Sequence, residues 1–101
     1  MKFEQLEQLI KIKDCGSISK AAVELHVAQS TLSASIKSLE DELGCQLIER
    51  GHKGVSLTPK GTEVYNQGKT ICEQVYNMKK ALEKKSNEEV VLSIANNYSV
   101  I

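Results

Sequence analysis

Residues 27–44 read VAQSTLSASIKSLEDELG, and this stretch decides the fold. Its apolar positions recur four, three and four residues apart, which predicts a helix with one buried stripe. They are Leu32, Ile36, Leu39 and Leu43. The first half of the stretch is otherwise rich in hydroxyl side chains, namely Ser30, Thr31, Ser33, Ser35 and Ser38. Because serine and threonine are mediocre helix formers that compete for backbone hydrogen bonds, we expect these side chains to serve something other than helix stability.

The segment before this helix predicts two more helices. Residues 3–14 carry helically spaced apolar side chains and end at Gly16. The next segment, SISKAAVELH (17–26), offers Ser17 and Ser19 as N-cap candidates and has a double alanine that lets two helices approach closely. A turn of a few residues then leads into the hydroxyl-rich helix. Two short helices joined in this way form a helix-turn-helix candidate.

The segment after Gly44 changes period from helix to strand. CQLIER (45–50) and GVSLT (54–58) are short β-prone runs around a glycine-rich turn at 51–54, which predicts a hairpin, or wing. Thr58 and Pro59 then have the residue types of an N-cap and a first helical position. The expected fold is mainly α, a winged helix-turn-helix of three helices and a β-hairpin over residues 1–58.

A long helix is predicted from Pro59 to about residue 85, roughly 40 Å at 1.5 Å per residue. A heptad seam runs along it and predicts a partner helix; its members are Val64, Gly68, Ile71, Val75, Met78 and Leu82. The alternative is that this stripe packs only on the first helix of its own domain. We assign residues 59–86 to a linker and dimerisation helix. The run VVLSIA (90–95) reads as a buried strand, so residues 87–101 are predicted to begin a further domain.

Composition excludes several classes of protein. The 101 residues contain 41% hydrophobic and 26% charged residues, as in an ordinary soluble domain. No apolar run approaches the roughly 20 residues that span a bilayer, and no signal-peptide pattern is present. We therefore expect a cytoplasmic protein without membrane contact.

The three cysteines, Cys15, Cys45 and Cys72, form no CxxC pair, so we expect reduced thiols without a disulfide or metal site. A redox sensor is the alternative that remains open for them.

Net charge is zero, yet cations are concentrated after the hydroxyl-rich helix. Residues 46–61 carry Arg50, Lys53 and Lys60 against a single acid, Glu49. Residues 17–45 carry two lysines against four acids. The zero total therefore conceals a partly basic face, which is compatible with a nucleic-acid partner.

Three segments resemble the LysR-type transcriptional regulators of bacteria: GSISKAAVELHVAQSTLSASIKSLEDELGCQLIER (16–50), GVSLTPKG (54–61) and the long helix before VVLSIA. The resemblance covers about residues 3–94. It implies a winged helix-turn-helix, a dimerising linker helix, and an effector domain like a periplasmic binding protein, assembled as a dimer or tetramer. It also implies no cofactor within this chain and a small-molecule effector that binds beyond Ile101. The chain departs from the family at Ser30, Ala34 and Ile48, where proline, arginine and phenylalanine are common.

We predict that the chain binds double-stranded DNA. With the apolar stripe inward, Ser30, Ala34 and Lys37 point outward and Thr31 and Ser33 flank them, a low profile that suits the major groove. Gln29 is matched to bidentate contact with adenine. The predicted surface also includes the helix-start residues Ser17, Ser19 and Thr58.

The wing residues Arg50 and Lys53 are predicted to contact DNA phosphates. For Arg50 an internal salt bridge, for instance to Glu49, is the alternative.

Three other functions fit less well. An enzyme is not expected, because Ser33 and His26 lack a GxSxG setting and so short a chain leaves no evident substrate pocket. A pure dimerisation module would leave the hydroxyl face and the wing unexplained. A different class of winged-helix repressor would not predict a long helix followed by a strand.

Overall fold

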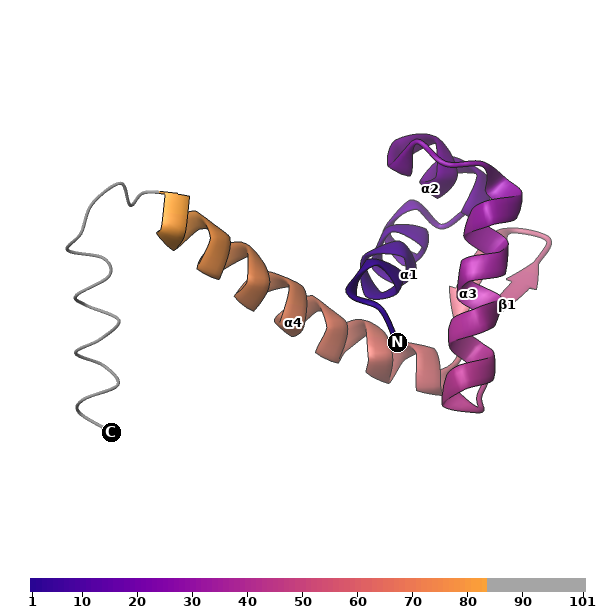
Figure 1. Ribbon diagram of the computed structural model, residues 1–101. Coiled ribbons are helices and arrows are strands. Elements are labelled where there is room, and N and C mark those ends of the chain that lie inside the picture. The colour runs from indigo at the N-terminus through magenta and orange to yellow at the C-terminus, as the bar shows by residue number, and fades with distance from the viewer. Residues whose placement is uncertain (84–101) are drawn as a thin grey trace.

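The computed structural model describes residues 1–83, which form four helices and one hairpin. In chain order the elements are α1 (Phe3–Cys15), α2 (Ile18–Leu25), α3 (Gln29–Leu43), β1 (Ile48–Gly51), β2 (Gly54–Leu57) and α4 (Pro59–Glu83). Helices α1 to α3 and the hairpin form one body, and α4 extends away from it (Figure 1). The predicted winged helix-turn-helix and long helix are confirmed. The predicted VVLSIA strand lies outside the described residues, and the domain boundaries stay predictions.

Short-range backbone chemistry ends each of the first two helices. Gly16 adopts φ 72° after α1, a left-handed conformation that glycine reaches without steric cost. The Ser17 hydroxyl then accepts the Lys20 N–H at 3.2 Å and caps α2. His26 ends α2 at φ 61°, so the chain reverses within a few residues and α3 begins at Gln29. The helix-turn-helix therefore has its predicted turn at 26–28.

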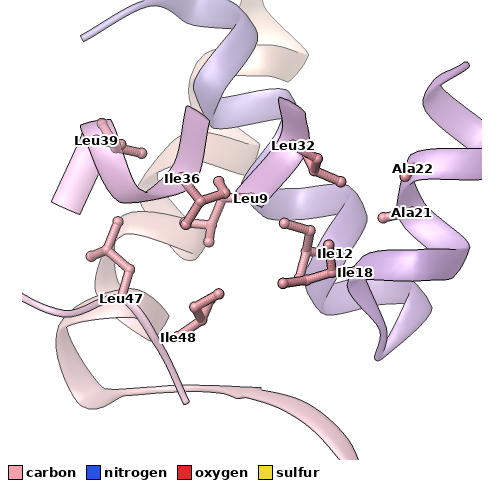
Figure 2. Close-up of a cluster of buried hydrophobic side chains, with 10 residues drawn as sticks. All are labelled: Leu9, Ile12, Ile18, Ala21, Ala22, Leu32, Ile36, Leu39, Leu47 and Ile48. Atoms are coloured by element: carbon pink, nitrogen blue, oxygen red, sulfur yellow. The ribbon is translucent and has the colours of Figure 1, made fainter. Parts of the chain in front are cut away.

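An aliphatic core joins the three helices to the start of the wing (Figure 2). Ala21 and Ala22 of α2 are buried, and their small side chains allow the close helix approach that the sequence predicts. The fully buried members of largest volume are Leu9, Ile12, Leu32, Ile36, Leu39 and Leu47. The prediction that Leu43 belongs to the buried stripe of α3 is wrong, because this residue is 37% exposed. The chain turns away at Gly44 and leaves this last turn of α3 uncovered among residues 1–83.

Glu40 connects the end of α3 to the wing. Its Oε2 accepts the backbone N–H groups of Leu47 at 2.7 Å and Ile48 at 3.2 Å. Hydrogen bonds to a charged acceptor are stronger than neutral ones, so this carboxylate holds the approach to β1. In the antiparallel hairpin, Ile48 pairs with Leu57 and Gly51 with Gly54.

Thr58 closes the hairpin onto the long helix. Its hydroxyl donates to the Gln46 carbonyl at 2.6 Å and accepts the Gly61 N–H at 2.9 Å, which confirms the predicted N-cap. The residue is only 7% exposed. Both hydrogen bonds are internal, so Thr58 is a buried cap, and we remove its side chain from the predicted DNA surface.

Helix α4 packs on α1 mainly along its first half. Val64 lies against the core, and Gly68 is buried facing Leu6 and Ile10 of the same chain. These two seam positions are therefore used within the chain. Further along, Ile71, Met78 and Leu82 are 43%, 55% and 54% exposed. The alternative, in which the whole stripe packs on its own first helix, does not hold for this part of α4.

Candidate nucleic-acid interface

The first turn of α3 is an exposed polar surface. Gln29, Ser30 and Thr31 are all exposed, and the N-cap residue Ala28 has no side-chain acceptor for the helix N–H groups. These N–H groups and the positive end of the helix dipole favour an anion at this place. The turn can therefore meet both base edges and phosphates.

Two hydrogen bonds connect α3 to its neighbours on this surface. From α2, the Ser19 hydroxyl donates to Gln29 Oε1 at 3.0 Å. From the wing, Arg50 Nη2 donates to Ser33 Oγ at 3.3 Å. Within residues 1–83, Arg50 forms no ion pair, so the alternative of an internal salt bridge is not realised there. The wing cation thus lies beside the hydroxyl-rich helix.

A shallow cleft of about 180 Å³ lies where α2, α3 and the wing meet. Four of the predicted DNA-binding residues line it: Ser17, Ser19, Gln29 and Arg50. The start of β2 holds the wing in place, because the Val55 N–H donates to the Gly16 carbonyl at 3.2 Å. A Cβ on Gly54, whose φ is 116°, would lie 2.5 Å from the same oxygen. A glycine is therefore required for this approach.

The cationic side chain on the outer face of α3, Lys37, is paired with an acidic side chain. Ala34 and Lys37 are exposed, as predicted, but Lys37 Nζ lies 3.3 Å from Asp41 Oδ1. Asp41 is not part of the site that the sequence predicts, although its i,i+4 spacing from Lys37 on a helix indicates an ion pair between the two side chains. Ser35 does not belong to the exposed hydroxyl side chains of α3, because it is half-buried and its hydroxyl donates to Gln8 of α1. Lys53 is exposed at the tip of the hairpin.

The cysteine thiols lie outside this surface. Partial burial, reinforced by Glu24, raises the pKa of the Cys15 thiol, and burial also raises the pKa of Cys72. Redox-reactive thiols have a lowered pKa, so both shifts run against the redox-sensor alternative. No group of three His, Cys, Asp or Glu side chains that could hold a metal ion occurs among the described residues.

Comparison with known protein families identifies the fold. Residues 3–62 match the family described as bacterial regulatory helix-turn-helix protein, lysR family. The chain belongs to the lysR family. This membership confirms the resemblance drawn from the sequence.

Curated lysR-family regulators share the matched segment. The nitrogen assimilation regulatory protein nac of Escherichia coli (strain K12) is 40% identical over an alignment of 89 positions that covers 81% of this chain and 29% of that regulator. HTH-type transcriptional regulator ClcR of Pseudomonas putida is 44% identical over 62 residues, 61% of this chain and 21% of ClcR. This chain therefore spans less than a third of these regulators. Both are regulators of transcription and not enzymes.

Solved structures place the lysR-family fold beside DNA. The crystal structure of the BenM_DBD/benA site 1 DNA complex is similar with a TM-score of 0.78 and 34% identity, covering 83% of this chain and 98% of that chain. The CbnR_DBD-DNA complex gives a TM-score of 0.77 and 30% identity, covering 86% and 100%. No helix within residues 1–83 of this lysR-family chain is both long and apolar enough to cross a membrane.

Proposed function

We propose that this chain is a sequence-specific binder of double-stranded DNA that regulates transcription. The observation that carries the proposal is the exposed first turn of α3, whose amide and hydroxyl side chains lie beside the Arg50 guanidinium. Similar DNA-bound structures support it. The proposal also includes a small-molecule effector that binds beyond Ile101, as the family resemblance implies. It includes a cytoplasmic location, which the sequence pattern predicts.

In this proposal α3 enters the major groove, which is about 12 Å wide. Gln29, Ser30, Thr31 and Ser33 contact base edges, and Ala34 keeps the helix surface low. Ser17 and Ser19 at the start of α2 line the same cleft as Gln29 and Arg50, and in this proposal they face the DNA backbone. This division follows the general pattern in which base contacts specify the sequence and phosphate contacts position the protein.

Cations on and beside α3 supply the contacts to the DNA backbone. Arg50 and Lys53 of the wing are exposed, as is Lys37 of α3. Lys37 forms an ion pair with Asp41, which partly neutralises its charge. Arg50 and Lys53 of the wing therefore make the larger electrostatic contribution to DNA affinity. Neutralising a phosphate contact should weaken binding to all sequences alike.

The far half of α4 supplies the contact between two copies. Ile71, Val75, Met78 and Leu82 follow one another at intervals of three to four residues. Ile71, Met78 and Leu82 are exposed, and Val75 is partly buried. A seam of this kind buries its apolar side chains against a second helix. Two copies joined here present two α3 helices to one DNA site, and a tetramer of two such pairs would span a longer site.

DNA selection followed by salt-dependent affinity measurement tests the DNA-binding proposal. The 101-residue chain is expected to enrich one sequence from a random duplex pool. Gln29→Ala should then lose discrimination at one base pair, by about 1–3 kcal/mol. Lys53→Ala should instead weaken all duplexes and lower the salt slope by about one ion, whereas Lys79→Ala on α4 is the matched control. Binding to every duplex with equal affinity would refute the proposed function.

Sedimentation tests the contact between copies. Ile71→Asp places a charge in the exposed seam and should yield monomers. Asn77→Asp adds the same charge at an exposed position outside the seam and should leave the dimer intact. If Ile71→Asp remains dimeric, another surface joins the copies. A pure dimerisation module, the alternative function, would form dimers without salt-dependent DNA affinity.

A further inference from the structure

Two side chains of the α3 surface are already hydrogen-bonded from outside α3. Gln29 Oε1 accepts the hydroxyl proton of Ser19, ten residues away in α2, at 3.0 Å. Ser33 Oγ accepts a guanidinium proton of Arg50, seventeen residues away in the wing, at 3.3 Å. In both cases the α3 residue is the acceptor.

The donors of the same two side chains remain available. An amide has its oxygen and nitrogen on opposite sides of one carbon, so an oxygen turned toward α2 leaves the nitrogen turned away from it. Gln29 Nε2 makes no hydrogen bond within residues 1–83, and the Ser33 hydroxyl has no acceptor there either. The amide N–H groups of Gln29 and the hydroxyl proton of Ser33 are therefore free to donate to a ligand.

We propose that Ser19 and Arg50 are positioning residues that make the start of α3 a hydrogen-bond donor surface. The inference rests on the proposed DNA binding and names the base edges that are read. A donor surface selects acceptors in the major groove: N7 and O6 of guanine, N7 of adenine and O4 of thymine. It does not select the amino groups of adenine or cytosine.

Gln29 then presents only part of the contact with adenine that its side chain could make. Bidentate contact with adenine needs the amide oxygen to accept from the N6 amino group while the nitrogen donates to N7. With the oxygen engaged by Ser19, only the donor half of that contact is presented. Fixing the rotamer in advance also lowers the entropy that the side chain loses on binding.

Base analogues test which edge is read. The full 101-residue chain is first used to select its preferred duplex, and the base pairs read by Gln29 and Ser33 are those at which the alanine variants lose discrimination. At those pairs, a 7-deaza purine, or a thymine analogue without O4, should weaken binding roughly tenfold. Replacing adenine by purine, which removes only the amino group, should change affinity less than about twofold.

Variants at Ser19 separate positioning from a merely structural role. Ser19→Ala frees the amide of Gln29 and should make binding sensitive to the amino group, whereas Ser19→Thr keeps a hydroxyl and should retain the wild-type analogue profile. Ser56→Ala, an exposed serine of β2 outside both hydrogen bonds, is the matched control. Circular dichroism confirms that each variant is folded.

Two results would overturn the inference. In the first, removal of the amino group weakens the wild-type complex as much as the 7-deaza change. In the second, Ser19→Ala leaves the analogue profile unchanged. If the chain selects no sequence at all, the proposed function itself fails, and this is visible before any analogue is used.

Discussion

Two glycines of α4 should respond in opposite directions to the same substitution. Gly61 lies in the first turn of the helix, and Gly68 lies two turns further along. A Cβ built on Gly61 would overlap the carbonyl oxygen of Leu47 and lie 2.8 Å from its carbonyl carbon. A Cβ on Gly68 would lie 3.5 Å from Leu6 Cδ2, an ordinary van der Waals contact. We therefore predict that Gly61→Ala destabilises the fold and Gly68→Ala does not.

The magnitudes follow from these contacts. Alanine is favoured over glycine in a helix by about 1 kcal/mol, which makes Gly68→Ala stabilising by about 0.5–1 kcal/mol. At Gly61 the obstacle is backbone, so no side chain can move aside, and overpacking of this kind costs about 1–3 kcal/mol or more. The Leu47 carbonyl also accepts the Thr58 N–H at 3.0 Å, and displacing it loses about 1 kcal/mol more. After the gain in propensity is subtracted, Gly61→Ala should destabilise by about 1–3 kcal/mol.

Urea unfolding followed by circular dichroism measures both changes. Protein concentration must be the same for all variants, because association between copies shifts the apparent stability. The expected order of midpoints is Gly68→Ala above wild type and Gly61→Ala well below it. A Gly61→Ala protein as stable as wild type would refute the argument that α4 begins in direct contact with the backbone before β1.

Three further predictions concern single side chains. Glu40→Ala leaves two backbone N–H groups without their acceptor and should lower the free energy of unfolding by about 2–3 kcal/mol in urea, whereas Glu40→Gln keeps an acceptor and should lose less; equal losses would contradict this reason. The Tyr65 hydroxyl donates to Asp14 at 2.7 Å, and this bond raises the pKa of Tyr65 above 10.0. The stability that it contributes is fully present below pH 10 and is lost as pH rises through the folded-state pKa. The urea midpoints of wild type and Tyr65→Phe should therefore differ at neutral pH and approach each other as pH rises above 10, and a difference that stays constant would contradict the assignment. Asp41→Asn releases Lys37 and should raise affinity for every duplex and the salt slope by about one ion, an effect absent if Lys37 does not face DNA.

Local signals account for the parts of the fold that the sequence predicts well. The turn at Gly16, the cap at Ser17 and the Thr58-Pro59 start of α4 depend on residues next to each other in the chain. Helical periodicity likewise identifies α3, because only one face of a helix can be buried. Such patterns need no knowledge of where the rest of the chain lies.

Side chains whose partners are distant in sequence account for the errors. Ser35 donates to Gln8, 27 residues away, and so leaves the solvent face. Thr58 is buried because its hydroxyl reaches the Gln46 carbonyl, twelve residues away. Gly68 has the spacing of a dimer seam, yet it packs on Leu6 in the same chain. No periodic pattern distinguishes a partner helix in this chain from one in a second copy.

The sequence by itself determined the architecture and the place of the candidate DNA surface. Apolar spacing, caps and turn residues act over a few residues, so they specify each element without a tertiary partner. Only the tertiary structure decided which polar atoms of that surface are free. From the sequence alone, the amide of Gln29 and the hydroxyl of Ser33 are candidates for DNA contact in the same way as the hydroxyls of Ser30 and Thr31. Hydrogen bonds from α2 and the wing occupy the acceptor atoms of Gln29 and Ser33, whereas their donor groups have no partner within residues 1–83.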